Sequence, residues 1–196
     1  MLLRWPRLPT PSRVRPERFA DPAAVIARDA TAADAAACAA IYAPYVLQTS
    51  VSFETEPPTP DQMAARIVAA GAKHAWLVLE HDGRVVGYAY AHPFAERAAY
   101  RWSCEVSIYL ERERHRSGGG RLLYEALLAR LAERGYRRAM AGMTLPNEAS
   151  ARFHQALGFE PVGVYRRVGW KNGAWHDVAW VQKTILDADD PPAEPG

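Results

Sequence analysis

Three consecutive glycines, Gly118 to Gly120, interrupt the sequence between two strongly patterned segments, and they constrain the fold more than any other feature. The preceding segment, CEVSIYL (104–110), alternates with the two-residue period of a half-buried strand. The following segment, RLLYEALLARL (121–131), carries apolar residues at helical spacing. Because glycine costs about 1 kcal/mol relative to alanine inside a helix, three glycines at a helix start require a specific reason.

The order strand, glycine loop, helix indicates a phosphate-binding site. The first amides of a helix lack intrahelical partners and lie at the positive end of its dipole. Glycines allow a bulky anion to approach these amides, because no Cβ atom stands in the way. His115, Arg116, Ser117 and Arg121 would add polar and cationic side chains around the anion. The alternative interpretation is a flexible loop that only caps the helix.

Two common nucleotide-binding motifs do not fit the glycine loop. A Walker loop needs Gly-Lys-Ser/Thr, whereas Gly120 is followed by Arg121 and Leu122. A dinucleotide fingerprint needs a third glycine where Leu123 stands.

The patterning of the other segments predicts one mixed α+β domain over residues 25–186. Helices are expected after the caps Thr31, Thr59 and Asn147. We expect Pro44 to end or kink the first helix and Gly71 to end the second. Strands are expected from residue 25, over 75–80, 85–92, 104–110 and 137–144, and in a final strand–turn–strand over 160–186.

The two ends of the chain differ from this domain in composition. Residues 1–24 are rich in proline and arginine and predict a loosely ordered basic extension, or sequence upstream of the true start codon. Residues 187–196, DADDPPAEPG, predict a disordered acidic tail.

Charge, hydropathy and cysteine usage exclude several classes of partner. The net charge of +2 does not argue for nucleic acid, and no apolar run approaches the roughly 20 residues of a membrane span. Cys38 and Cys104 are two lone thiols, which favours a reducing, cytoplasmic compartment. The six histidines lie far apart without metal-ligand spacing, so we expect no metal.

Two motifs together resemble those of the GNAT superfamily of N-acetyltransferases. The segment HRSGGG (115–120) is similar to the family's pyrophosphate-binding loop, with His115 in place of the usual Gln or Arg. The segment NEASARFHQALGF (147–159) is similar to a second family motif, with Ser150 replacing alanine and His154 replacing tyrosine. Segments from FETEPPTP (53–60) to GWKNGAWHDVAWVQ (169–182) narrow the resemblance to the phosphinothricin and methionine sulfoximine N-acetyltransferases.

The resemblance implies a fold, a cosubstrate and an assembly. The α+β GNAT fold has a mixed, mostly antiparallel sheet of six or seven strands, flanked by about four helices. Its fourth and fifth strands splay apart to admit the pantetheine arm of acetyl-CoA. The implied protein is a homodimer that acetylates the amino group of a small amino acid, a reaction linked to herbicide resistance.

The resemblance also implies catalytic roles. Glu105 matches the general base, since an ammonium must lose a proton before its nitrogen attacks the thioester. The alternative for Glu105 is an ion pair with Arg101 or Arg112. His154 would protonate the departing CoA thiolate, and Tyr124 is a second candidate for that proton.

Binding residues follow from the same resemblance. Those implied for acetyl-CoA are Val106, Ile108, Leu110, His115, Arg116, Ser117, Gly118, Gly119, Gly120, Arg121, Asn147 and Ser150. Arg97 would bind the acid group of the substrate with its guanidinium. Phe53, Tyr100 and Trp102 would form the walls of the substrate pocket, although Trp102 could equally be an ordinary core residue. Ala95 stands where the family often has a second basic residue, which favours neutral sulfoximine or sulfone heads over phosphinate. The final hairpin, with Trp170, Trp175, His176 and Asp177, would lie near the active site, often that of a neighbouring subunit.

Three other functions remain open from the sequence. A protein N-terminal acetyltransferase would need an open groove, and a polyamine acetyltransferase would line its pocket with carboxylates, whereas PFAERAAYR (93–101) offers arginines. An acyl-CoA-binding sensor without turnover would not need the base, yet Glu105 is present.

Overall fold

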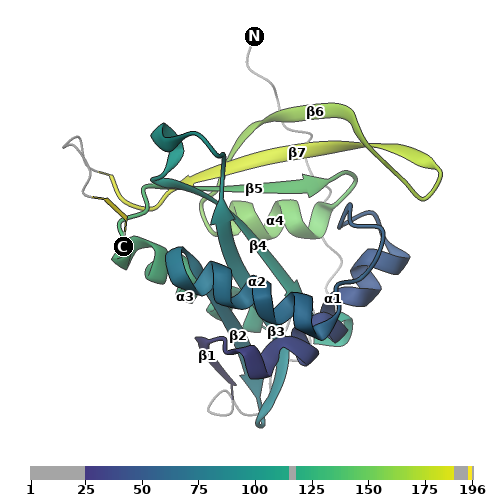
Figure 1. The fold of residues 1–196 in the computed structure, drawn as a ribbon. Helices are drawn as coiled ribbons and strands as arrows, with labels where there is room; N and C mark the ends of the chain where they lie inside the picture. The colour runs from purple at the N-terminus through teal and green to yellow at the C-terminus, as the bar shows by residue number, and fades with distance from the viewer. Residues whose placement is uncertain (1–24, 115–117, 188–193, 196) are drawn as a thin grey trace.

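A seven-stranded sheet organises the chain in the computed structural model, which describes residues 25–114, 118–187 and 194–195 (Figure 1). The strands are β1 (Val25–Asp29), β2 (Ala75–His81), β3 (Arg84–Pro93), β4 (Ser103–Leu110), β5 (Arg138–Thr144), β6 (Glu160–Lys171) and β7 (Ala174–Thr184). The helices are α1 (Ala35–Gln48), α2 (Pro60–Lys73), α3 (Gly119–Glu133) and α4 (Glu148–Ala156). Short 3₁₀ turns are η2 (Ala32–Asp34), η3 (Ala98–Tyr100) and η4 (Arg112–Arg114).

The sheet is mixed, and its strand order is β1-β2-β3-β4-β5-β7-β6. Every neighbouring pair is antiparallel except β4 and β5, which run parallel. Their pairing covers only three residue pairs and stops at Glu105 and Met140. The predicted fold class, with its splayed fourth and fifth strands, is therefore confirmed.

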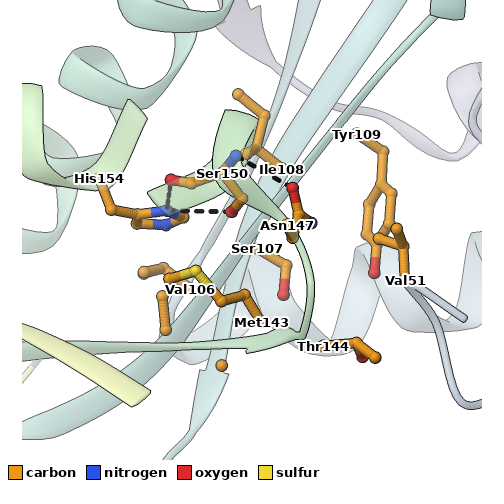
Figure 2. A pocket seen from close by; sticks show the side chains of 12 residues that line it. Val51, Val106, Ser107, Ile108, Tyr109, Met143, Thr144, Asn147, Ser150 and His154 are labelled. Atoms are coloured by element: carbon orange, nitrogen blue, oxygen red, sulfur yellow. Dashed lines mark hydrogen bonds between the residues drawn. The ribbon is translucent and has the colours of Figure 1, made fainter. Parts of the chain in front are cut away.

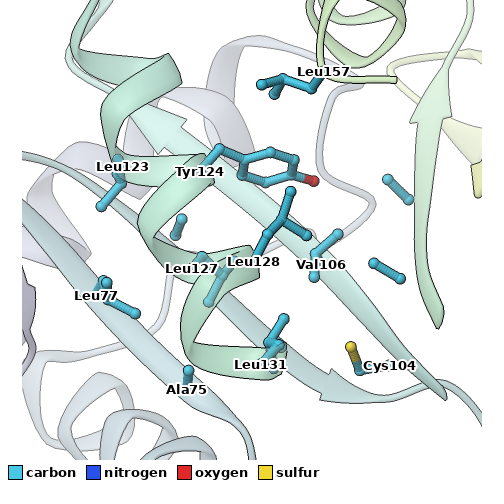
Figure 3. Packing of buried hydrophobic residues seen from close by; sticks show 14 of the residues in the cluster. Ala75, Leu77, Cys104, Val106, Leu123, Tyr124, Leu127, Leu128, Leu131 and Leu157 are labelled. Carbon is cyan, nitrogen blue, oxygen red and sulfur yellow. The ribbon is translucent and has the colours of Figure 1, made fainter. Parts of the chain in front are cut away.

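Two apolar cores lie on opposite faces of the sheet. On one face, Leu123, Leu127 and Leu131 of α3 are fully buried against β2 and β4 (Figure 3). On the other face, Met63 of α2 and Val46 of α1 are buried over the central strands. The core on the α3 side fixes this helix, and with it the glycine loop, against the strand that carries Glu105.

Side-chain caps expected from the sequence stand at the starts of α2 and α4. The Thr59 side chain accepts a hydrogen bond from the backbone amide of Gln62 and forms a capping box at the start of α2. The Asn147 side chain caps α4 in the same way, by accepting from the backbone amide of Ser150.

The predicted end at Gly71 is wrong, and of the two outcomes expected at Pro44, an end or a kink, the end does not occur. Helix α1 continues through Pro44 to Gln48, because Tyr45 and Val46 are buried and their packing outweighs the backbone hydrogen bond that proline removes. Helix α2 likewise continues two residues past Gly71, to Lys73.

The described residues contain no helix that is long and apolar enough to cross a membrane. The predicted extension over residues 1–24 and most of the predicted tail lie outside the described residues.

Candidate active site

A pocket opens where β4 and β5 diverge (Figure 2). Each strand contributes four consecutive residues beyond the last paired position, namely 106–109 from β4 and 141–144 from β5. Val51 from the α1–α2 connection closes one side, and residues of α4 and its cap close another. The remaining lining residues are Asn147, Ser150 and His154.

The inner edges of the diverged strands lack strand partners among the described residues. Along its other edge β4 is fully paired with β3, and β5 is paired with β7. Backbone amides and carbonyls on the inner edges therefore face the pocket rather than a neighbouring strand. Since backbone polar groups need partners, this edge suits an extended ligand that carries amide groups of its own.

The side chains of β4 divide between the two faces of the sheet. Val106 is buried in the core below α3, where Ile108 and Leu110 pack at its edge. Val106 and Ile108 line the pocket, whereas Leu110 does not. Ser107 and Tyr109, on the opposite face, also line the pocket, and the sequence analysis did not select them.

The glycine loop lies at the start of α3, and its glycines have different roles. Gly118 has φ of +93°, a left-handed conformation that favours glycine. A Cβ atom at Gly120 would lie 3.1 Å from Cδ1 of Leu110, so this glycine allows α3 to approach β4 closely. Gly119 is buried in the same helical turn. The predicted residues His115, Arg116 and Ser117 lie outside the described residues.

Arg121, also predicted to surround the anion, extends from the first turn of α3. Its Nε donates to the Glu125 carboxylate at 2.8 Å, and its side chain is exposed. The guanidinium therefore already has an anionic partner one helical turn away.

Glu105 is the last residue of β4 that pairs with β5, so it stands at the apex of the divergence. Its Oε2 lies 3.8 Å from Nε2 of His92, the residue opposite it on β3. Burial raises the pKa of Glu105, and the positive charge of His92 opposes that rise. Neither alternative ion pair forms, since Arg101 reaches Glu194 and Arg112 reaches Gln48.

His154 and Tyr124 form a buried pair at the other side of the pocket. Nδ1 of His154 lies 2.9 Å from the Ser150 carbonyl oxygen, which only accepts, so Nδ1 carries the proton. Nε2 of the neutral ring therefore accepts from the Tyr124 hydroxyl at 3.0 Å. Burial lowers the pKa of His154 and raises that of Tyr124 far above its usual range. His154 lines the pocket, whereas Tyr124 stands behind it.

Asn147 and Ser150 lie in the pocket wall but also have structural roles. Oδ1 of Asn147 accepts from the Ser150 amide at 3.1 Å as the cap of α4. The Ser150 hydroxyl lies 3.3 Å from Nδ1 of His154 and therefore helps to orient that ring (Figure 2).

The predicted acceptor-binding residues do not line this pocket. Phe53 packs against the backbone of Gly169, where a Cβ atom would come within 2.2 Å of its ring. Arg97 is exposed and precedes η3, and the ring of Tyr100 contacts Phe94 at 5.7 Å. Trp102 is half-buried beneath the guanidinium of Arg101.

The final hairpin extends beyond the sheet on the side of α1 (Figure 1). Trp170 and Trp175 are exposed and contact each other at 5.4 Å between ring centroids. His176 is half-buried, with Nε2 3.0 Å from the Lys171 carbonyl oxygen, and the Asp177 carboxylate accepts from the Arg167 amide at 2.7 Å.

Sequence reasoning missed His92 and Lys171. Strand register places His92 opposite Glu105, but nine residues separate β3 from β4, so turn length did not reveal that register. Lys171 precedes an Asn-Gly turn, where a lysine resembles an ordinary solvated turn residue. Among the described residues, no group of three or more His, Cys, Asp or Glu side chains gathers as for a metal ion.

Known proteins are similar to this chain in both sequence and architecture. The family model "Acetyltransferase (GNAT) domain" matches residues 27–180. Phosphinothricin N-acetyltransferase of Streptomyces viridochromogenes is 39% identical over 169 residues, covering 86% of this chain and 92% of that protein. The L-methionine sulfoximine/L-methionine sulfone acetyltransferase of Salmonella typhimurium is 30% identical, covering 85% and 98%.

A solved structure agrees with these sequence matches. The GNAT superfamily phosphinothricin acetyltransferase of Sinorhizobium meliloti, in complex with acetyl-CoA, superposes with a TM-score of 0.82 at 34% identity. The match covers 87% of this chain and 94% of that one. The family model, the relatives and the diverging parallel strands agree, and the chain belongs to the GNAT acetyltransferase family.

Proposed function

We propose that this protein transfers the acetyl group of acetyl-CoA to the α-amino group of a small amino acid, with Glu105 as general base. Phosphinothricin, methionine sulfoximine and methionine sulfone are the acceptors suggested by the relatives' names. Membership of the GNAT family already makes the chain an acetyl-CoA-dependent N-acetyltransferase. The observation that carries the finer proposal is the position of Glu105 at the apex of the β4–β5 divergence, one residue before the first β4 residue that lines the pocket.

The described residues fit acetyl-CoA at two places. The unpaired inner edges of β4 and β5 offer backbone groups to the amide-containing pantetheine arm. The first turn of α3, opened by Gly118, offers a positive helix end to the pyrophosphate. The bound cosubstrate supplies the thioester whose carbonyl carbon the amine attacks.

Glu105 removes the proton that keeps the acceptor amine unreactive. Its half-buried carboxylate has a raised pKa, which makes it a stronger base than an exposed glutamate. The ammonium proton passes to Glu105 directly or through one water. The freed nitrogen lone pair then forms the new amide bond as the carbon–sulfur bond breaks.

His154 and Tyr124 supply the proton that the leaving thiolate takes up. His154 faces the pocket, and its Nε2 accepts from the buried Tyr124 hydroxyl at 3.0 Å. The Nδ1–H of His154 is the ring proton that can pass to the leaving thiolate, and the Tyr124 hydroxyl can then return a proton to the ring at Nε2.

The acceptor end, the assembly and the location are further parts of the proposal. Arg97 would bind the acid group of the amino acid, and Phe53 and Tyr100 would form walls around it. These three side chains lie outside the pocket between β4 and β5. The exposed hairpin tryptophans Trp170 and Trp175 support a homodimer. The buried free thiols of Cys38 and Cys104 support a cytoplasmic location.

A panel of acceptors, read by release of CoA thiol, tests this function. We expect turnover with methionine sulfoximine and methionine sulfone, and less with phosphinothricin, because Ala95 removes a cation near its extra charge. Glu105→Gln serves as the chemical control and should lower kcat about 10²–10⁴-fold at neutral pH. Turnover of only polyamines or peptide N-termini would exclude the amino-acid acceptors. Wild-type activity in Glu105→Gln would exclude Glu105 as base.

A further inference from the structure

One buried cation connects two distant parts of the chain next to the pocket. Lys171 is the last residue of β6, directly before the turn into β7, and it is only 7% exposed. Its Nζ donates to the carbonyl oxygens of Val46 at 2.6 Å, Ser52 at 2.7 Å and Glu54 at 2.7 Å. An ammonium has three donors, so all of them are used within the protein.

The three acceptors belong to the end of α1 and the connection that follows it. Val46 is in the last turn of α1, where carbonyls lack intrahelical partners and a cation is favourable. The neighbouring Tyr45 carbonyl oxygen accepts from the Thr49 hydroxyl at 2.6 Å, so the helix end is held by side chains. Ser52 and Glu54 belong to the segment over residues 49–54, which has no regular secondary structure.

Burying the Lys171 ammonium costs desolvation free energy, which its hydrogen bonds to residues 46, 52 and 54 must offset. Burial lowers the pKa of Lys171, and the Glu54 carboxylate opposes that change. That carboxylate is itself fixed by Arg66, at 2.7 Å and 3.0 Å, and by the Tyr42 hydroxyl at 3.1 Å. Lys171 therefore completes a network that anchors residues 52–54 at both backbone and side chain.

The 49–54 segment forms the wall between the pocket and the hairpin. Val51 lines the pocket beside Tyr109 (Figure 2). Two residues later, Phe53 packs against Gly169 of β6 and lies 6.2 Å from the ring of His176. A displacement of this segment would therefore move one residue of the pocket and one proposed acceptor-binding residue together.

We propose that Lys171 is a positioning residue for the acceptor amino acid: its ammonium fixes the 49–54 segment, so acceptor binding depends on the β6–β7 hairpin. This inference rests on the proposed function, because it assumes an acceptor next to Val51 and Phe53. In the part of the chain that the structure describes, the Lys171 ammonium donates to neither Gly118–Gly120 nor the inner edges of β4 and β5, and Val51 is the pocket residue that its segment carries; the KM for acetyl-CoA should therefore depend on Lys171 much less than the KM for the acceptor.

Lys171→Met tests the inference, because it keeps the alkyl stem and removes all three donors. We expect the KM for the acceptor to rise about tenfold or more, while the KM for acetyl-CoA stays within about twofold. Lys183→Met is the matched control, since Lys183 is a half-buried lysine on β7 at the far end of the same hairpin. We expect Lys183→Met to leave both KM values unchanged.

A general loss of stability in Lys171→Met would not affect the KM for the acceptor selectively. If both KM values change together in Lys171→Met, or neither changes, Lys171 is only structural and the inference is wrong. If Lys171→Met does not fold, Lys171→Arg decides by the same criterion, because a planar guanidinium cannot reproduce three converging contacts. Turnover by the wild-type protein, measured in parallel, tests the proposed function separately. If the wild-type protein does not acetylate the amino acids, the proposed function is wrong, independently of the results with the Lys171 variants.

Discussion

Glu105 and His92 form a pair in which the charge of His92 affects the protonation of Glu105. Nδ1 of His92 lies 3.1 Å from the Pro93 carbonyl oxygen, so Nδ1 donates and Nε2 faces Glu105. When His92 is protonated, its charge lowers the pKa of Glu105 against the effect of burial. His92 therefore favours the deprotonated form of the base, and with 40% of its side chain exposed it lies between Glu105 and solvent.

Burial favours the neutral form of four other titratable side chains around this pair. Burial raises the pKa of Cys104 and of Tyr90 to about 12, and that of Tyr124 well above its usual value. Burial also lowers the pKa of His74, which senses the charge of His92, to about 4.

His92→Gln should move the acid limb of the kcat/KM profile to higher pH. Removing the cation raises the pKa of Glu105, and a base with a higher pKa needs a higher pH to lose its proton. Half-exposed ion pairs contribute roughly 0.2–1 kcal/mol, which corresponds to a shift of about 0.2–0.7 pH units. Initial rates between pH 5 and 9, at low acceptor concentration, measure it.

His81→Gln is the control for this shift. His81 lies at the end of β2, where it pairs with Asp82 at 3.5 Å, and its loss should leave the profile unchanged. A His92→Gln profile that superposes on the wild-type profile, or moves to lower pH, contradicts the coupling.

At the level of the secondary-structure elements, two glycines at the start of α3 have different structural roles. Gly118 supplies a left-handed backbone with open space around it. Gly120 removes a side chain that would approach Leu110 at 3.1 Å and Phe153 at 3.7 Å. Gly118 shapes the loop, and Gly120 brings the positive helix end close to β4.

Gly120→Asp should raise the KM for acetyl-CoA about tenfold or more, because its side chain would meet Leu110 and Phe153, push the start of α3 away from β4 and add a negative charge beside the first helix amides. Gly120→Ala adds only the methyl group and should have a smaller effect. Steady-state kinetics with acetyl-CoA as the varied substrate measure both variants, and thermal unfolding confirms that they fold.

Gly71→Asp provides a matched glycine-to-aspartate control. Gly71 lies in α2, and no atom of the described residues comes within 4 Å of its Cβ position, so this change should not alter the KM. An unchanged KM in folded Gly120→Asp would mean that the glycine loop does not bind the cosubstrate.

For the whole molecule, the edge strand β6 exposes unusually many large apolar side chains to solvent. Exposed fractions reach 63% for Tyr165, 59% for Trp170 and 54% for Val168. Large exposed apolar patches mark interaction sites on proteins. The same hairpin holds the 49–54 segment through Lys171, so an interface there would lie next to the pocket.

We expect the protein to sediment as a dimer and Trp170→Ser to shift the equilibrium toward monomer. Buried tryptophans at interface centres contribute about 2 kcal/mol or more, so the dissociation constant should rise roughly 30-fold. Sedimentation equilibrium measures it, with Leu47→Ser on α1, 61% exposed, as the control. A wild-type monomer at micromolar concentration, or a Trp170→Ser dimer of unchanged affinity, contradicts this assembly.

The amino-acid sequence by itself determined the features that depend on neighbours along the chain. The alternation in CEVSIYL placed Val106 in the core, because side chains of a strand alternate between faces. Thr59 and Asn147 capped their helices as expected, since a cap needs only the first helical turn. The family motifs placed His154, Asn147 and Ser150 in one pocket because they share one short helix.

Only the tertiary structure decided which distant residues meet. The parallel pairing of β4 and β5 ends after three residue pairs, and nothing in either strand's pattern marks that point. Lys171 reaches carbonyls 117 to 125 residues away, and His92 faces Glu105 through strand register. Pro44 remains helical because tertiary burial outweighs its local cost. Such contacts depend on packing among elements remote in sequence, so local periodicity and propensity do not specify them.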